Sequence, residues 1–398
     1  MSLGKTFARR LRWHRSRQGK SQAVIAGLAG LNPEYVGQIE RENRTPSLDT
    51  VEALAIALSV PVAQLLTETE EPARVPTEAQ LASDLHHALH TSSTDRDQQG
   101  LLLSDLRERV DHAWHVWQGA PDRYSRIFPL IAPLVREVTQ YCSQSTGSDG
   151  QRLAADAYGL LRTVARRTNH KELALLAADR GTRAAERSCD PVRLATARWN
   201  SSHALLALGE HGAAQEVALD AISRMSSIKS RGAGAITGAL WLTAAVAQAR
   251  SGDKFTALEW INDRAAPLAE KTGETNVGRT CFGPSNVALH AVSIELEDGQ
   301  AASALALADR IDTSPLASRE RHTTWSLDLA RGHILRLDPG AAMLYLLQAE
   351  TTGSEDLRYN SDAHDTLRRV LHRARPSIRA QAVGLTRRLG IEEVILAG

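Results

Sequence analysis

Cysteine is scarce in this sequence, and its few residues form no pattern. Cys142, Cys189 and Cys281 are far apart and odd in number, so neither a disulfide framework nor a cysteine-based zinc site is expected. Cys281 has two interpretations, a redox-sensing thiol or a buried structural one. Because no nearby His or Lys would lower its pKa, the sequence favours the buried thiol.

Long apolar runs are also absent. No stretch approaches the ~18 apolar residues that a membrane span requires, and the first residues, MSLGKTFARR, lack the apolar core of a secretory signal. We therefore expect a cytoplasmic protein without a membrane partner.

The motifs of common enzyme classes are missing too. The sequence contains no His-Glu-x-x-His, no Walker loop and no Gly-x-Ser-x-Gly. His86 and His90 have the i,i+4 spacing of a metal-binding pair, but no third ligand is evident, which favours solvated or capping histidines. We expect no enzymatic activity, no metal site and no cofactor.

The residues that are present predict an all-α fold. Aromatic residues make up only 4% of the chain, whereas Ala and Leu, both strong helix formers, dominate it. Apolar residues recur at helical spacing, and no strand-like alternation persists. The expected architecture is a five-helix helix-turn-helix domain followed by an α-solenoid of paired helices.

The net charge of +1 conceals an asymmetry. Residues 1–48 contain nine Lys and Arg against three acids, a balance of +6. The other 350 residues contain the remaining 38 of the 47 bases and 43 of the 46 acids, a balance of −5. A basic N-terminal segment on a mildly acidic body is typical of a polyanion-binding domain joined to a regulatory one, although a solvated basic helix would give the same count.

The N-terminal segment predicts five short helices. We expect them over about 3–17, 22–29 and 33–41, with a fourth capped by Ser47 or Asp49 and a fifth over 61–66. Asn32 is a favourable N-cap and Pro33 suits the first helical position, so the third helix should start sharply there. Val24, Ile25 and Leu28 form the expected inward face of the second helix.

Two short helices joined by a glycine-containing turn form a helix-turn-helix. The matching residues are Ser21, Gln22, Ala26, Gly30, Ile39-Glu40-Arg41, Thr45-Pro46-Ser47-Leu48, Leu54-Ala55, Ala57-Leu58 and Val60. On these residues, the segment from Phe7 to Leu66 resembles the DNA-binding domain of the Cro and phage-repressor group, the XRE family. The resemblance implies a domain that binds double-stranded DNA, with the third helix in the major groove.

The resemblance also implies which side chains contact DNA. They are Gln22, Asn32, Pro33, Glu34, Tyr35, Gln38, Arg41 and Arg44. Gln22 stands where relatives meet a phosphate and often a base edge. Gln38 suits adenine and Glu34 suits a cytosine amino group, whereas Arg41 and Arg44 suit phosphates.

Three further residues follow from the same resemblance. Arg15 and Glu40 correspond to a charged pair that ties the first helix to the third, and Glu42 stands where relatives usually have Gly. An alternative interpretation is a protein-binding module that has lost its DNA affinity, but the density of arginines around the third helix favours DNA.

The rest of the chain predicts a linker and a repeat domain. We expect the DNA-binding domain over 1–67, an acidic linker with two prolines over 68–77, and helical repeats over 78–398. Similar segments recur 39 to 47 residues apart, and their equivalent starts are Glu172, Ala213, Lys254, Ala301 and Gly340. Such a period indicates an α-solenoid. The small residues Ala214, Ala257, Ala304 and Ala342 mark the expected close helix crossings.

The repeats loosely resemble tetratricopeptide repeats, although they are longer than the usual ~34 residues. The order of an XRE domain, a hinge and degenerate repeats is similar to that of peptide-responsive quorum-sensing regulators of Firmicutes. It is more similar to actinobacterial XRE regulators with helical repeats, on the segments 110–134, 282–299 and 357–374.

This organisation predicts a transcriptional regulator that binds an inverted-repeat operator as a homodimer and senses a small molecule or peptide. Placed on the tetratricopeptide register, the effector-binding candidates on the inner face are Arg166, Trp199, His203, Asn286 and Arg331. Trp199 has a second interpretation as core packing. The alternative function is a DNA-tethered protein-interaction scaffold without a small-molecule ligand. The sequence leaves open the effector, the operator and the direction of regulation.

Overall fold

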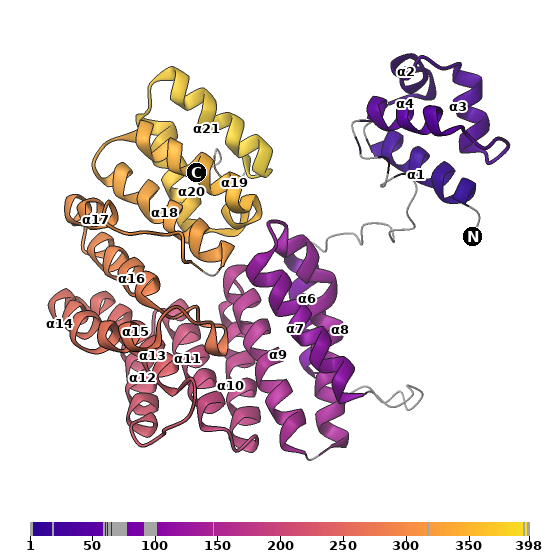
Figure 1. Ribbon diagram of the computed structural model, residues 1–398. Helices are drawn as coiled ribbons and strands as arrows, with labels where there is room; N and C mark the ends of the chain where they lie inside the picture. The colour runs from indigo at the N-terminus through magenta and orange to yellow at the C-terminus, as the bar shows by residue number, and fades with distance from the viewer. Residues whose placement is uncertain are drawn as a thin grey trace. The chain divides into compact units, whose positions relative to one another are not determined.

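Every regular element in the described part of the computed structural model is a helix, which confirms the predicted all-α fold. The structure describes residues 3–17, 20–58, 60, 62, 65, 78–90, 102–145, 147–316, 318–392 and 395. The chain divides into two compact units, residues 1–75 and 76–398, called here the N-terminal unit and the helical body (Figure 1). The predicted linker, 68–77, lies outside the described residues. Among the described helices, none combines the length and apolarity needed to cross a membrane.

The described helices of the N-terminal unit follow the predicted order. They are α1 (Leu3–Arg17), α2 (Gln22–Leu28), α3 (Pro33–Glu40) and α4 (Leu48–Leu58). Of the predicted fifth helix over 61–66, only Val62 and Leu65 are described, so most of it lies outside the described residues.

Local capping explains where α2 and α3 begin. The Ser21 hydroxyl accepts a hydrogen bond from the Val24 amide at 3.2 Å, and the Asn32 side-chain oxygen accepts one from the Glu34 amide at 2.9 Å. Each bond satisfies an amide that has no partner inside its helix. Gly30 supplies the turn between the two helices with φ of 65°, a conformation that favours glycine.

The core of this unit corrects one sequence expectation. Its buried residues are Phe7, Leu11, Ile25, Ala26, Val36, Ile39, Val51, Leu54, Ala55, Leu58 and Leu65. Val24 and Leu28, predicted to face inward, are 48% and 59% exposed. The seven-residue α2 buries only the narrow face centred on Ile25 and Ala26. Because Val24 and Leu28 are i,i+4 neighbours, they share the opposite flank of the helix.

The helical body contains α6 (Glu78–His90), α7 (Leu103–Gly119), α8 (Arg123–Gln144), α9 (Ser148–Arg167), α10 (Lys171–Arg187), α11 (Pro191–Leu208), α12 (His211–Met225), α13 (Ala233–Arg250), α14 (Lys254–Trp260), the π-helix η1 (Ile261–Ala265) and α15 (Ala266–Thr272). It continues with the 3₁₀-helix η2 (Val277–Arg279), α16 (Pro284–Glu297), α17 (Ala301–Ala308), α18 (Arg319–Leu335), α19 (Pro339–Tyr359), α20 (Ser361–Arg373) and α21 (Pro376–Leu389).

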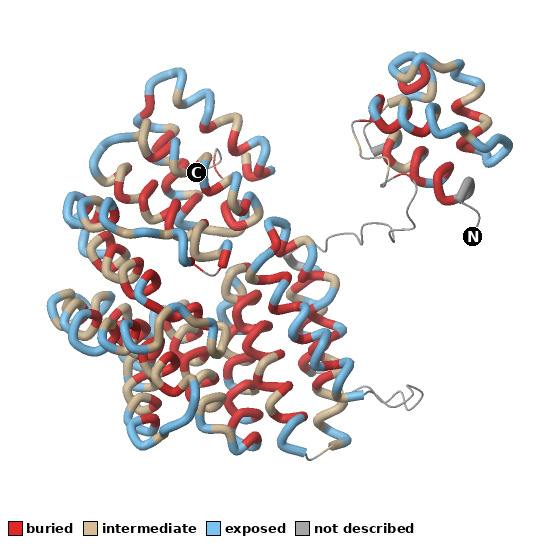
Figure 2. The backbone as a smooth tube through the Cα atoms, viewed as in Figure 1, coloured by how far each residue is buried: buried red, intermediate tan, exposed pale blue. Residues whose placement is uncertain are grey.

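Consecutive helices of the body pack against one another and form a curved row (Figure 1). Their buried faces meet between neighbouring helices, whereas exposed positions line the outside of the row (Figure 2). The predicted crossing residues Ala214, Ala257, Ala304 and Ala342 are all fully buried. Helices that pass closely require small side chains at the crossing, and the burial of these four alanines agrees with that expectation.

Contacts between α8 and α19 join two distant parts of the row. The carboxylate of Glu355 accepts hydrogen bonds from the Tyr124 and Ser125 amides at 2.7 and 3.2 Å, at the N-terminus of α8. Arg123 forms a buried ion pair with Asp356. Gly353 has φ −165° and ψ 82° inside α19, and this kink precedes the two acids. These contacts link residues at least 230 positions apart in sequence.

Candidate functional site

The outer face of α3 presents the predicted base-facing side chains. Pro33 and Glu34 are exposed, and Tyr35 and Gln38 are half-buried. The opposite face carries Val36 and Ile39 into the core, among other buried residues. The helical period therefore separates a packing face from a face that is free to contact a ligand.

A buried acid fixes α3 to its neighbours. The carboxylate of Glu40, on a side chain only 3% exposed, accepts hydrogen bonds from Arg15 Nε at 2.6 Å and Arg15 Nη2 at 2.9 Å. It also accepts one from Gln22 Nε2 at 2.7 Å. The hydrogen bond to Glu40 is the main cause that raises the pKa of Arg15 above its ordinary value. The pair predicted between Arg15 and Glu40 is thus present, and it also positions Gln22.

Gln22 keeps polar capacity beyond its bond to Glu40. A primary amide offers two N–H donors and one carbonyl acceptor, so one N–H and the oxygen remain for another partner. Gly37 makes room for this side chain, because a Cβ at that position would lie 3.3 Å from Gln22 Oε1 and 3.5 Å from Arg41 Nη2.

The cationic residues that follow α3 are exposed. Arg41 and Arg44 are both solvent-accessible, and the Arg44 guanidinium lies over the Tyr35 ring, 5.4 Å from its centroid. Glu42 adopts φ of 63°, a left-handed conformation that agrees with a position usually held by Gly. The surface around α3 can therefore present two cations and a mixed set of hydrogen-bonding groups to a polyanion.

A second candidate site is a cavity of about 60 Å³ in the helical body. Three of the five predicted effector-binding residues line it, namely Arg166, Trp199 and His203. The remaining lining residues are Trp114, Gln118, Arg162, Thr163, Arg167, Arg279, Cys281, Glu320 and Arg321. The structure thus brings together side chains from α7, α9, α11, α18 and the segment before α16.

The other two predicted residues lie elsewhere. Asn286 is only 2% exposed and does not line the cavity, and its side-chain oxygen is buried without a hydrogen-bond partner. Arg331 lines a separate cavity of about 670 Å³ and lies 3.6 Å from Glu297. The tetratricopeptide register placed all five residues on one face of the helical body. In the structure, three of them line the 60 Å³ cavity, Asn286 is buried outside it and Arg331 lines another cavity.

The segment between α15 and α16 forms one wall of the 60 Å³ cavity. Asn276 donates to Gln118 of α7 at 2.8 Å, and Arg279 pairs with Asp111 at 2.6 Å. Arg279 and Cys281 have φ of 61° and 51°, which is strained backbone for residues other than Gly. Burial raises the pKa of Cys281, in line with the expected structural thiol.

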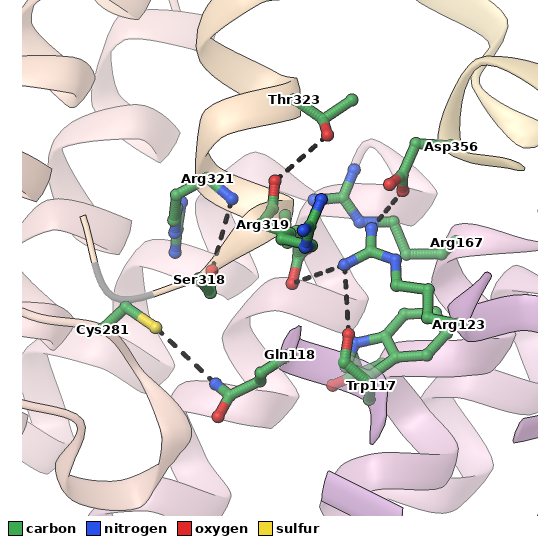
Figure 3. A network of polar contacts seen from close by, with 12 residues as sticks. Trp117, Gln118, Arg123, Arg167, Cys281, Ser318, Arg319, Arg321, Thr323 and Asp356 are labelled. Carbon is green, nitrogen blue, oxygen red and sulfur yellow. Dashed lines mark hydrogen bonds and ion pairs between the residues drawn. The ribbon is translucent and has the colours of Figure 1, made fainter. Parts of the chain in front are cut away.

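Ion pairs neutralise part of the charge beside the cavity (Figure 3). Arg123 pairs with Asp356 and donates to the Trp117 carbonyl at 3.3 Å, and Arg167 pairs with Glu320. Burial alone would raise the pKa of Glu320, but the nearby arginines, Arg167 above all, outweigh burial and hold it well below its usual range.

The imidazoles in this region are uncharged at neutral pH. His203 shares a hydrogen bond with Thr243 at 3.3 Å, and burial lowers its pKa well below the ordinary value. Burial also lowers the pKa of His290 to about 4. Within the described part of the chain, no three His, Cys, Asp or Glu side chains gather as a metal site would require.

Sequence reasoning missed most of the residues that line this cavity. Arg162 and Arg321 both line it, yet neither was among the candidates. The i,i+4 spacing of Arg162 and Arg166 was a usable signal, because it places both on one face of α9. No local signal in the sequence connected α9 with α18.

Comparison with known proteins agrees with the geometry of the N-terminal unit. Residues 6–67 match the family described as a helix-turn-helix domain. The control protein C.SmaI of Serratia marcescens is 36% identical over 67 residues, which cover 17% of this chain and 80% of that protein.

A solved structure of Bacillus thuringiensis PlcR, in complex with the peptide PapR7 and DNA, aligns with 67% of this chain and 95% of that chain. Its sequence identity is 12% and its TM-score is 0.30, which is too low to relate the two bodies in detail. The match to the control protein and the geometry of α2 and α3 concern the N-terminal unit. On that unit, the chain belongs to the XRE-type helix-turn-helix family of DNA-binding regulators.

Proposed function

We propose that this protein is a dimeric, sequence-specific transcriptional regulator whose helical body senses a small molecule or peptide. In this proposal, residues 1–67 bind the operator and residues 68–77 connect the two domains. Residues 78–398 form the dimer and regulate DNA binding. The observation that carries the proposal is the outer face of α3, where hydrogen-bonding side chains stand beside exposed arginines on a helix fixed by Glu40.

Base contacts and phosphate contacts come from different residues. Gln38 pairs with adenine and Glu34 accepts from a cytosine amino group, because their groups match those base edges in the major groove. Arg41, Arg44 and the remaining N–H of Gln22 bind phosphates. Asn32 caps α3 and, with Pro33 and Tyr35, forms the edge of the same surface.

A dimer reads an inverted repeat whose half-sites lie about 10 bp apart, one turn of the double helix. The effector occupies the inner face of the helical body and changes operator affinity by favouring one dimer geometry. Support for a small ligand comes from the cavity lined by Arg166, Trp199 and His203. A protein-interaction scaffold does not require such a cavity.

The direct test is capture of sheared genomic DNA on the purified full-length protein, followed by sequencing. We expect an enriched inverted repeat. Gln38→Ala should relax the preference at one base position and cost about 1–3 kcal/mol of specific binding. Arg41→Ala should instead weaken binding to all sequences. It should also reduce the slope of log K against log salt concentration by about one, because one phosphate contact is lost.

Arg183→Ala is the matched control, because Arg183 is an exposed arginine of the helical body. It should retain the same DNA. The proposal fails if Gln38→Ala and Arg41→Ala retain the wild-type sequences at wild-type affinity, or if a monomer binds a single half-site as tightly as the full repeat.

A further inference from the structure

The 60 Å³ cavity holds more positive than negative charge. Five arginines line it, but only Arg167 and Arg279 have carboxylate partners, Glu320 and Asp111. The other three are Arg162, Arg166 and Arg321, and none of them forms an ion pair within the described residues.

Arg162 is the most deeply buried of the three, with 2% exposure. Its guanidinium donates to the side-chain oxygen of Asn200 and lies over Trp199, 5.2 Å from the ring centroid. Its Nε is buried without a partner. An amide and an indole both favour a guanidinium, but neither carries a charge that would neutralise it.

Arg166 lies one helical turn further along α9. Its Nε is also buried without a partner, and its guanidinium makes no hydrogen bond to the described residues. Burial, and then the neighbouring Arg167, lower the pKa of Arg166 to about 9. Burial also lowers the pKa of Arg162, with Arg166 as the next cause. Each guanidinium therefore makes its neighbour harder to keep charged.

The surrounding side chains do not supply the missing negative charge. Glu320 is used by Arg167 and also lies 3.8 Å from Arg123, and burial keeps the Cys281 thiol protonated. Burial holds His203 neutral, so it contributes no charge to the cavity. Cations buried without counterions are costly for a folded protein, and a site that binds an anion has this composition.

The volume of the cavity suits a small anionic group. At 60 Å³, it has room for about four or five water-sized groups, the size of a carboxylate or phosphate with its first attached atom. A neighbouring cavity of about 470 Å³ shares the lining residues Arg166 and Arg167. That larger space can hold the remainder of a molecule whose anionic end is in the smaller one.

We propose that Arg162, Arg166 and Arg321 form an anion-binding subsite that takes the carboxylate or phosphate group of the effector. The subsite itself stands on the geometry of the cavity, and its regulatory role rests on the function proposed above. Arg162 and Arg166 are held by α9, while Arg321 comes from the first turn of α18. An anion between them joins two helices that are far apart in the chain.

The test measures thermal unfolding of the full-length protein with inorganic phosphate, sodium acetate, or tetra-alanine with a free or amidated C-terminus, at constant ionic strength. We expect a saturable rise in Tm. A response to phosphate alone identifies a phosphorylated ligand. A response to acetate and to the free peptide, but not to the amide, identifies a carboxylate ligand.

Two variants connect this response to the arginines. Arg166→Gln and Arg321→Gln should each raise the Kd of the responding anion at least about tenfold, because each removes a charge-assisted contact. Arg166→Gln should also raise the Tm without added anion, since it removes a buried charge that has no counterion. A merely structural arginine would show the opposite change. Arg167→Gln should show it, because it removes the hydrogen-bonded ion pair with Glu320 and leaves only the longer contact of Glu320 with Arg123.

Arg183→Gln is the control for general effects of charge and should behave as wild type. The subsite is overturned if no probe gives a saturable response, or if both Arg166→Gln and Arg321→Gln retain wild-type affinity for the anion. Failure of the proposed function looks different. In that case the anion still binds and the arginine variants still weaken anion binding, but adding the anion does not change the affinity for the operator.

Discussion

Replacing Glu40 by Ala should release α3 from the rest of the N-terminal unit. The substitution removes three hydrogen bonds at once and leaves Arg15, 14% exposed at its side chain, without its partner. Breaking a buried ion pair from one side costs about 3–5 kcal/mol. Because Arg15 keeps some contact with water, we expect the lower limit, about 3 kcal/mol of the free energy of unfolding of this unit.

Hydrogen exchange on the full-length protein measures this loss locally, which avoids assuming one unfolding transition for two units. At about 1.4 kcal/mol for each factor of ten, the amides of α2 and α3 should exchange about 100-fold faster in the variant. Exchange in α9 and α11 of the helical body should not change. Gln22→Ala, which removes only one of the bonds to Glu40, should accelerate exchange about tenfold or less.

The double variant Arg15→Met with Glu40→Leu completes the cycle. It removes both charges together, so it should be less destabilised than Glu40→Ala alone. Exchange accelerated less than about threefold in Glu40→Ala would refute the reasoning, as would a double variant whose loss equals the sum of the two single losses.

Three further predictions concern other parts of the chain. Glu42→Gly should stabilise the N-terminal unit by about 0.5–1 kcal/mol, because it relieves the left-handed backbone at φ 63°. Glu52→Gly, at an exposed position inside α4, should instead destabilise the unit by about 1 kcal/mol. Equal effects of the two glycine substitutions on hydrogen exchange would contradict this prediction. Burial raises the pKa of Asp328 to about 7, so its contribution to stability is present below the unfolded pKa near 4 and is lost as pH rises through 7. Asp328→Asn should therefore raise the Tm of the body at pH 8 and not at pH 4. Glu355→Gln should lower stability by about 1–2 kcal/mol, because the α8 N-terminus loses a charged acceptor. Faster exchange should appear in the first turn of α8, whereas Glu350→Gln, a change to an exposed ion pair with Arg388, should have little effect.

Much of the N-terminal unit was predictable from sequence, because its signals are local. A side-chain cap needs only the two or three residues that follow it, so Ser21 and Asn32 indicate the starts of α2 and α3 wherever these helices lie. The crossing alanines were predictable for a similar reason. In a repeat, each unit meets the next one in the same way, so Ala214 and Ala257 are expected at equivalent positions, and both are buried.

Only the tertiary structure decided which faces are buried and which charges are compensated. Val24 and Leu28 fit an apolar face in the sequence, but the short α2 meets its neighbours through Ile25 and Ala26. Arg166 and Arg167 are adjacent in the sequence. Arg167 has Glu320 as a partner, more than 150 residues away, and Arg166 has none. Pairing between such distant residues depends on how the row of helices curves, and no local pattern of amino acids encodes that curvature.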